Sequence, residues 1–343
     1  MKENCNRRDF IKMAAIAGAG IGVSGIIDPL YAKNNRQEAG KRIGIIGLDT
    51  SHAVAFTRTL NDLNAGPQYG GYKIVAAYPK GSNDILKSVE RIPGYTEEVK
   101  KMGVEIVSSI SELLKKVDVV LLETNDGRLH LEQAMPVIKA GKRLFIDKPI
   151  AASLKDAKAI FDAAQRYNVP VFSSSSLRYI TGIDDVKAGK LGKIIGAETY
   201  SPATLEKTHP DFFWYGIHGV EILFTLMGTG CKQVSRVHTD DTDVTIGVWE
   251  DDRIGTFRGT RSGKSAYGGT VFAEKATVSL GDFKGYNPLL EQIIQFFQTG
   301  IVPVKPEETL EICAFMEAAD ESKVKGGASV SIDSIFKKAG ITK

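Results

Sequence analysis

The sequence predicts an α/β protein with a Rossmann-like, doubly wound parallel sheet, followed by an α+β domain with a mostly antiparallel sheet. From residue 41 to 175, short runs of Val, Ile and Leu alternate with stretches of helical period, as in a parallel sheet covered by helices. From residue 194 onward, apolar residues recur with period two between turn residues, which is typical of antiparallel strands. With 343 residues, the chain is long enough for two domains.

The composition is that of an ordinary soluble globular protein, with 43% hydrophobic and 25% charged residues. The net charge of +3 is too small and too evenly spread to indicate a nucleic-acid partner. The three cysteines, Cys5, Cys231 and Cys313, lack metal-binding spacing. We therefore expect no metal site, and two buried free thiols rather than a Cys231–Cys313 disulfide.

The first 32 residues resemble a twin-arginine export signal. Arg7 and Arg8 precede a Gly- and Ala-rich apolar run over 13–27, which is shorter than the roughly 20 residues that span a bilayer. A membrane anchor or a chance basic start is the alternative. The resemblance implies a periplasmic protein exported already folded, with a polar linker over 33–40 and no membrane span after processing.

The first domain, 41–175, is expected to alternate strands and helices. The predicted strands cover 42–47, 72–78, 104–107, 117–123, 144–146 and 169–173. The predicted helices cover 52–63, 109–116, 129–140 and 152–167. Parallel strands in this order would make a dinucleotide-binding domain.

The second domain, 176–343, is expected to hold about six strands and to form the substrate and oligomerisation domain. The predicted strands cover 194–200, 234–238, 244–249, 253–259, 269–273 and 276–280, and the predicted helices 216–227, 289–298 and 307–324. The acidic stretch 240–243 lacks the glycine and closing glutamate of a calcium loop, which favours a hairpin turn. An exposed sheet face here would suit a homodimer or tetramer.

Asp147, Lys148 and Pro149 end the strand 144–146, where ligands of parallel sheets bind. Pro149 prevents a helical conformation at Lys148 and so directs the amine away from the strand tip. The alternative is an exposed turn with ordinary charges.

Several motifs together resemble the Gfo/Idh/MocA oxidoreductases. They are Thr124-Asn125, His130, 140–142, Asp147-Lys148-Pro149, 187–192, the His218 segment ending at Gly228, and the helix through Ala318-Ala319. The resemblance implies NAD or NADP on the first domain and a sugar or cyclitol on the second. It also implies that Lys148 hydrogen-bonds the reacting oxygen and that His218 acts as acid or base.

The first helix entry departs from the family pattern. It reads Gly47-Leu48-Asp49-Thr50-Ser51-His52, whereas the dinucleotide fingerprint requires glycine at positions 49 and 52. Asp49 adds a side chain and a negative charge where the pyrophosphate would approach. Either the dinucleotide binds with a shifted pyrophosphate, or the loop serves another ligand.

The end of the second strand also departs from the pattern. Residues 77–82 contain no carboxylate to hold the ribose hydroxyls. Lys80 and Ser82 could accommodate a 2′-phosphate, which favours NADP over NAD; a solvated turn is the alternative.

The substrate domain carries the third departure. Trp214 stands where the family commonly has an aspartate four residues before the histidine, and it suits stacking on a sugar ring. Glu221 could orient His218, and Tyr215 could donate a proton. His209 lies close in sequence. Arg178, after the last strand of the first domain, either faces the cleft and binds substrate or lies at the surface.

Three functions stay open from the sequence. The first is a periplasmic NAD(P)-dependent oxidoreductase that acts on a sugar-like alcohol or ketone through Lys148 and His218. The second is a glycoside hydrolase or lyase that uses transient oxidation by bound NAD. The third is a carbohydrate-binding protein without redox chemistry, which Asp49 and the missing ribose carboxylate favour.

Overall fold

A computed structural model describes residues 40–341 of the protein. The predicted export signal and nearly all of the linker lie outside the described residues. No helix within 40–341 is both long and apolar enough to cross a membrane.

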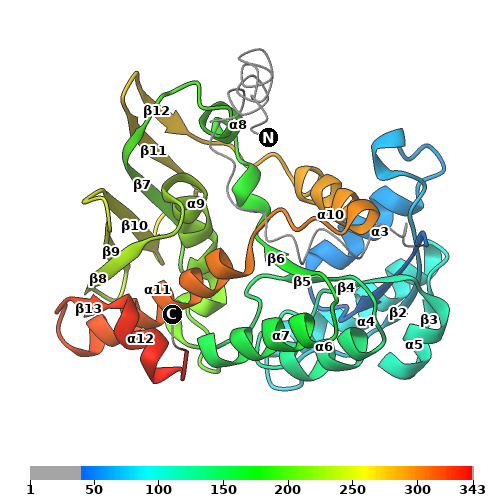
Figure 1. Ribbon diagram of the computed structural model, residues 1–343. Coiled ribbons are helices and arrows are strands. Elements are labelled where there is room, and N and C mark those ends of the chain that lie inside the picture. Colours follow the sequence, from blue (N-terminus) through cyan, green and yellow to red (C-terminus); the bar gives the residue numbers. More distant parts are fainter. Residues whose placement is uncertain (1–39, 342–343) are drawn as a thin grey trace, which may run out of the picture. The chain divides into compact units, whose positions relative to one another are not determined.

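The first sheet has six parallel strands in the order β3-β2-β1-β4-β5-β6 (Figure 1). Their bounds are β1 Arg42–Ile46, β2 Lys73–Tyr78, β3 Glu105–Ile106, β4 Val119–Leu122, β5 Leu144–Asp147 and β6 Val171–Ser174. From β1, the chain first adds β2 and β3 on one side and then adds β4, β5 and β6 on the other, so the switch point lies between β1 and β4. A doubly wound sheet opens a ligand-binding crevice at such a switch point, beyond the carboxyl ends of its strands.

Helices connect these strands. They are α3 Ser51–Asn61, α4 Leu86–Lys101, α5 Ile110–Lys116, α6 His130–Lys139 and α7 Leu154–Arg166, with a short 3-10 turn at Pro67–Tyr69. Ser109 caps α5 by accepting a hydrogen bond from Glu112 N at 3.1 Å. Helix α4 was not predicted, because Pro93 and Gly94 in its interior normally indicate a break.

The second sheet has seven strands, in the order β12-β11-β7-β10-β9-β8-β13. Their bounds are β7 Ile194–Pro202, β8 Cys231–His238, β9 Thr242–Trp249, β10 Ile254–Thr260, β11 Gly268–Ala273, β12 Thr277–Leu280 and β13 Val330–Ser331. All neighbouring pairs are antiparallel except β7 and β10, which run parallel. The predicted fold class, a parallel Rossmann-like sheet followed by a mostly antiparallel one, is confirmed.

The remaining helices surround the second sheet or return to the first. Their bounds are α8 Ile183–Lys187, α9 Ile217–Met227, α10 Asn287–Thr299, α11 Pro306–Val324 and α12 Ile332–Lys338, with a 3-10 turn at Ser176–Tyr179 and a π-helical turn at Phe212–Gly216. Helices α9 and α11 pack against strands of the second sheet (Figure 1). Almost every residue of α9 is buried, including His218.

The helix α10 belongs by sequence to the second domain but packs into the core of the first. Its buried side chains join the cluster of β1, β5 and β6, and the rings of Phe172 and Phe296 lie 4.7 Å apart. Arg143, which precedes β5, donates hydrogen bonds to the carbonyl oxygens of Phe297 and Gln298. The first core is therefore completed by residues far along the chain.

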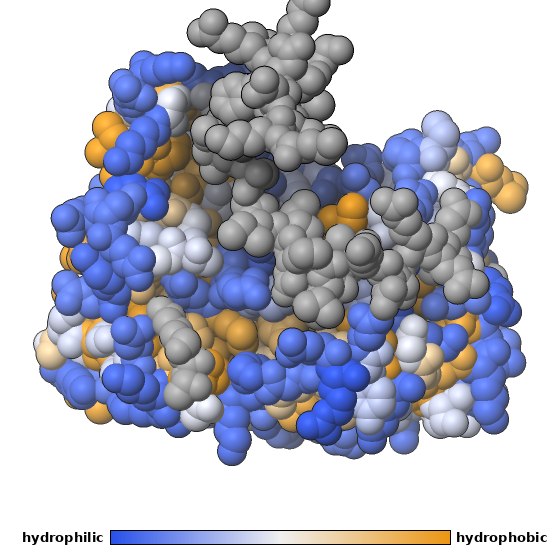
Figure 2. Space-filling model, viewed as in Figure 1, coloured by the Kyte–Doolittle hydropathy of each residue, from blue (hydrophilic) through white to orange (hydrophobic). Residues whose placement is uncertain are grey.

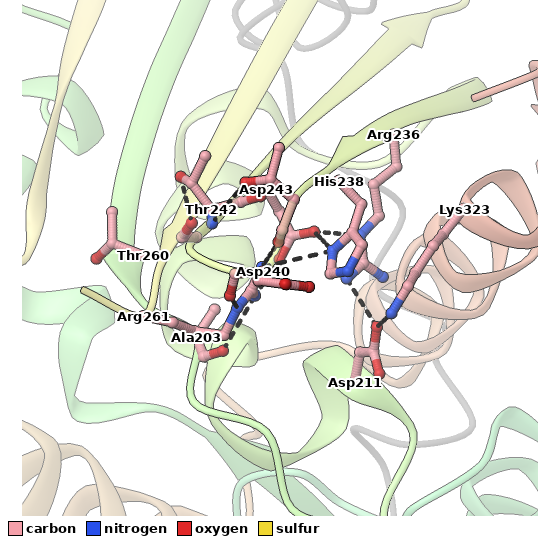
Figure 3. Close-up of polar contacts among 12 residues, drawn as sticks. Ala203, Asp211, Arg236, His238, Asp240, Thr242, Asp243, Thr260, Arg261 and Lys323 are labelled. Carbon is pink, nitrogen blue, oxygen red and sulfur yellow. Dashed lines mark hydrogen bonds and ion pairs between the residues drawn. The ribbon is translucent and has the colours of Figure 1, made fainter. Parts of the chain in front are cut away.

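Of the acidic stretch 240–243, Asp240 and Asp241 lie in the turn between β8 and β9, as predicted, whereas Thr242 and Asp243 begin β9. Asp243, at the end of this stretch, is buried and binds Arg236, His238 and Arg261 (Figure 3). Cys231 and Cys313 are buried and no disulfide links them, which confirms the prediction for these two thiols. Hydrophilic residues cover most of the face shown in Figure 2, with apolar residues between them.

Candidate active site at the carboxyl ends of the first sheet

A cavity of about 190 Å³ opens where the carboxyl ends of the first sheet face the second domain. It is lined by Thr50, Ser51, His52, Arg91, Asn125, Asp147, Lys148, Ser176, Leu177, Tyr215, His218, Tyr267, Phe283 and Tyr286. The structure therefore brings together Lys148, His218 and Tyr215, the three residues predicted to be catalytic. Tyr267, Tyr286 and Arg91 also line the cavity, and no sequence motif had indicated them.

Lys148 follows the last residue of β5, and its side chain reaches this cavity with 8% of the residue exposed. Its backbone amide donates to Asp147 Oδ1 at 2.8 Å, which fixes the turn after the strand. An ammonium group in such a buried position is a strong hydrogen-bond donor to a substrate oxygen.

His218 lies in the first turn of α9 and lines the same cavity as Lys148. Its Nδ1 is 2.7 Å from Ser175 Oγ, and its ring meets the rings of Tyr215 and Tyr267 at 4.9 and 6.0 Å. Burial, followed by the nearby Lys148 charge, lowers the pKa of His218 well below its usual value. A neutral imidazole can accept a proton, so His218 is suited to act as a base.

The expected contact between Glu221 and His218 is not formed. Glu221 instead binds the guanidinium of Arg178, which also binds Glu308. Ser175 takes the place beside His218 that Glu221 was expected to fill. Arg178 is 5% exposed and faces a second hollow beside Lys187 and Glu308, so it does not line the cavity of Lys148.

Trp214 and His209 form a ring pair beside the cavity, with centroids 5.0 Å apart, and neither lines it. His209 Nε2 lies 3.2 Å from Asp126 Oδ1. Tyr215 does reach the cavity, where its hydroxyl is 2.8 Å from that of Tyr267.

His130 and Thr124 hold the backbone that shapes the site. His130 Nε2 lies 2.7 Å from Thr124 O, and Nδ1 lies 3.0 Å from Pro149 O. The imidazole thus ties the end of β4 to the segment after Lys148. Gly47 has φ of +88°, and a Cβ there would come within 2.4 Å of Thr124 Oγ1, so this glycine is required by close packing.

The loop between β1 and α3 does not fit a dinucleotide in the usual extended pose. Asp49 is fully buried, and its carboxylate accepts hydrogen bonds from Asn125 N at 3.0 Å and Ser82 N at 3.3 Å. A pyrophosphate normally needs the space and the amides that a glycine provides there. The cavity is also smaller than the roughly 300–1,000 Å³ of typical ligand pockets.

The proposed 2′-phosphate contacts at the end of β2 also differ from expectation. Ser82 Oγ donates to Asp84 Oδ1 at 2.8 Å and to Asp126 Oδ2 at 2.9 Å, and it is buried. Two carboxylates beside Ser82 would repel a phosphate. The structure therefore opposes the interpretation of Ser82 as a phosphate ligand.

Three buried side chains meet behind the cavity, at the switch point of the sheet. His52 Nδ1 lies 3.1 Å from Asp147 Oδ1 and 3.7 Å from Glu123 Oε2. Burial and the neighbouring Asp147 raise the pKa of Glu123 well above its usual value. Glu123 was missed by the sequence reasoning, although a carboxylate directly after the apolar run of β4 is a signal that could have found it.

The architecture and the position of the cavity define the class of this protein: a Rossmann domain joined to an α+β domain, with a polar site between them. Residues 41–175 match the Gfo/Idh/MocA family model, described as "Oxidoreductase family, NAD-binding Rossmann fold". The match covers less than half of the chain, and over this part the chain is similar to the NAD-binding Rossmann domains of that oxidoreductase family.

Curated relatives match the chain only in part. The 1,5-anhydro-D-fructose reductase of Ensifer adhaerens is 32% identical over 119 residues, 33% of this chain and 35% of that protein. The uncharacterised oxidoreductase YhhX of Escherichia coli is 26% identical over 157 residues, 41% of this chain and 43% of that protein. An uncharacterised oxidoreductase of Streptococcus pneumoniae matches over 32% of its length.

Solved structures share the fold over most of the chain. A scyllo-inositol dehydrogenase from Lactobacillus casei, with NAD(H) and scyllo-inositol bound, has a TM-score of 0.67 at 16% identity and covers 85% of this chain and 99% of that one. A probable dehydrogenase from Thermotoga maritima has a TM-score of 0.68 at 18% identity, with coverages of 86% and 99%. At sequence identities this low, the similarity to these two structures establishes the shared fold alone.

Proposed function

We propose that this protein is an oxidoreductase that acts on a hydroxyl or carbonyl group of a small polyol or sugar-like molecule. The observation that carries the proposal is the shared cavity of Lys148 and His218 at the switch point of an NAD-binding Rossmann domain. The relatives named as a reductase of an anhydro-sugar and as an inositol dehydrogenase support the substrate class. The cavity volume suits a substrate of this small size.

Lys148 and His218 would both act on the reacting oxygen, Lys148 as a hydrogen-bond donor and His218 as the acid or base. The Lys148 ammonium would donate a hydrogen bond to that oxygen and stabilise negative charge on it. His218, neutral because of its burial, would take the hydroxyl proton during oxidation and return it during reduction. Tyr215 and Tyr267, joined through their hydroxyls, would form a wall that orients the ring of the substrate.

The placement of Asp49 favours a second candidate, a carbohydrate-binding protein without redox chemistry. A carboxylate that already binds Asn125 N and Ser82 N leaves these amides unavailable to a phosphate. For the oxidoreductase, a dinucleotide must follow a shifted path or displace Asp49. A glycosidase or lyase that depends on transient oxidation by bound NAD would likewise need the dinucleotide to follow a shifted path or to displace Asp49.

The first test is mass spectrometry of the molecules released when the natively purified protein is denatured. Stoichiometric NAD(H) or NADP(H) supports the oxidoreductase. A protein that releases none, and that does not bind added dinucleotide in calorimetry, supports the binding protein. If the charge of Asp49 is the obstacle, Asp49→Gly tightens dinucleotide binding; unchanged affinity would show that the loop is adapted to another ligand.

The second test is turnover of a panel of polyols and sugars, followed by nicotinamide absorbance. Lys148→Met and His218→Asn should each lower kcat/KM by about 100-fold or more, because each removes a group that acts on the reacting oxygen. Lys275→Met, which removes an exposed lysine outside the cavity, serves as the matched control. Retention of full activity by Lys148→Met would contradict the assigned role.

A further inference from the structure

The buried carboxylate of Glu123 forms no hydrogen bond of good geometry with the described residues, and Thr50 is the hydroxyl side chain that lies near it. The residue is 0% exposed, and neither Oε1 nor Oε2 forms a hydrogen bond within the part of the chain that the structure describes. Asp147 Oδ2, which is also buried, is in the same situation. An unsatisfied buried carboxylate costs several kcal/mol in general, so such a group normally has a partner.

Protonation does not remove the problem. A neutral carboxyl group still presents an O–H donor and a carbonyl acceptor, and the Thr50 side chain can pair with only one of them. Asp49, which lies in the same region, adds a third buried carboxylate, whose oxygens are bound by backbone amides. Lys148 already supplies one positive charge near these carboxylates, and their unused oxygen atoms are available to a further cationic partner.

His52 completes a set of metal-ligand types with Glu123 and Asp147. One ligand atom from each residue lies within 4.8 Å of the others, and His52 Nδ1 is 3.1 Å from Asp147 Oδ1 and 3.7 Å from Glu123 Oε2. Ligands at about 2.0–2.2 Å from a metal ion lie roughly 3.0–3.6 Å apart in tetrahedral or octahedral coordination. The two separations from His52 lie in or close to this range, and the Glu123 and Asp147 ligand atoms lie within 4.8 Å of each other.

The three residues come from three neighbouring elements of the fold, which hold the three side chains in fixed positions relative to one another. His52 lies in the first turn of α3, Glu123 follows β4, and Asp147 ends β5. His52 and Asp147 also line the cavity, so an ion could enter from that side and keep a coordination position open toward it. His52 occupies the place of the third fingerprint glycine, so the departure of the loop from the fingerprint supplies a ligand.

We propose that His52, Glu123 and Asp147 bind a divalent first-row transition metal ion. One imidazole nitrogen and two carboxylate oxygens suit ions such as Mn²⁺, Fe²⁺ and Zn²⁺. The proposal departs from the sequence-based expectation of no metal site. It goes beyond the proposed function, because it requires neither a dinucleotide nor a substrate.

The test is metal binding by the full-length, folded protein. The protein is stripped with a chelator and dialysed separately against Mn²⁺, Zn²⁺ and Mg²⁺, and bound metal is measured by plasma mass spectrometry. We expect about one equivalent of Mn²⁺ or Zn²⁺, a raised melting temperature, and visible d–d bands of a mixed nitrogen and oxygen site after loading with Co²⁺.

Variants distinguish this site from adventitious binding. Glu123→Gln, which preserves size, and His52→Asn should each weaken binding at least tenfold while circular dichroism confirms folding. His238→Asn is the matched control. Nδ1 of His238 also lies close to a buried aspartate, at 2.7 Å from Asp243 Oδ1, but His238 is not part of the group formed by His52, Glu123 and Asp147. This variant should bind metal like the wild type.

Three outcomes would overturn the proposal. They are a wild-type protein that takes up no transition metal, uptake of Mg²⁺ alone, or equal uptake by folded Glu123→Gln. Each of these results would leave the three side chains as a buried polar cluster without a transition metal. Metal uptake is measured without dinucleotide, so failure of the proposed redox function leaves this result interpretable.

Discussion

At the scale of single residues, the sequence predicted which residues lie at the site better than it predicted which side chains they contact. Lys148 was placed at the site because it follows a short apolar strand, and the structure confirms its position at the carboxyl end of β5. The partner of His218 could not be predicted. Helical spacing shows which residues share the face of a helix, but Ser175 comes from a distant segment, and Glu221 binds Arg178 instead.

Ser175 offers a test of how His218 is held. We infer that Ser175→Ala frees the imidazole to rotate, since Nδ1 loses its partner at 2.7 Å. As Ser175 acts through His218, the variant should lower kcat roughly tenfold with little change in KM. The ¹⁵N chemical shifts of His218 should also report a changed tautomer balance.

Ser174→Ala is the control for this variant, because Ser174 Oγ donates to the carbonyl of Ser175 and not to His218. Ser175→Thr, which keeps a hydroxyl, should restore the ¹⁵N signature. Equal shifts in Ser175→Ala and the wild type would show that the hydroxyl does not select the tautomer.

At the scale of elements, periodicity located most strands and helices within a few residues. The predicted strand at 144–146 and helices at 109–116 and 307–324 nearly coincide with β5, α5 and α11. Helix α4 was missed because Pro93-Gly94 is a local breaking signal that the packing of the neighbouring residues overrides. The parallel pairing of β7 and β10 was also beyond prediction, since alternation does not specify neighbours.

Helix α4 gives a direct test of backbone entropy. Gly94 lies in the helix interior, and a Cβ added there meets no atom within 4 Å. Gly94→Ala should therefore stabilise the protein by about 0.5–1 kcal/mol, because alanine restricts the unfolded chain and fits the helix. The change is measured by urea unfolding.

Gly103 provides the contrasting substitution. A Cβ there also meets no atom within 4 Å, but φ is +85°, in the left-handed region. Gly103→Ala should destabilise the protein by about 1 kcal/mol or more. Stabilisation by both substitutions would mean that chain entropy outweighs backbone conformation at these sites.

At the scale of the whole molecule, buried ion networks link distant parts of the second domain. Arg236 on β8 binds Asp243 on β9, Asp211 before the π-helical turn, and Asp320 on α11 (Figure 3 shows the first two contacts). Such long-range contacts could not be derived from sequence, because neither charge nor spacing identifies a partner beyond the local element. The predicted fold class needed only the hydrophobic pattern.

Asp243 predicts a pH dependence of stability. Burial raises its pKa, but hydrogen bonds from Arg236, Arg261 and His238 outweigh burial and lower the pKa below its usual value. The ionised group therefore stabilises the fold fully above its unfolded pKa of about 3.9, and this contribution is lost as the pH falls through the lower folded pKa.

Asp243→Asn should cost about 3 kcal/mol or more at pH 7, because it leaves buried Arg236 with fewer compensating charges. The difference in unfolding free energy between wild type and variant should narrow below about pH 4. Urea unfolding over a pH series measures it. A difference that stays constant down to the acid transition would show that shape, and not charge, makes Asp243 important.

The return of α10 to the first core bears on the order in which the protein can be made. Synthesis proceeds from the N-terminus, yet the apolar face of β1, β5 and β6 is covered by Leu289, Ile293, Phe296 and Phe297. The core of the Rossmann domain therefore cannot be completed, and this apolar face stays exposed, until most of the 343 residues have left the ribosome. A stop codon before α10 would release a chain that exposes this face and aggregates.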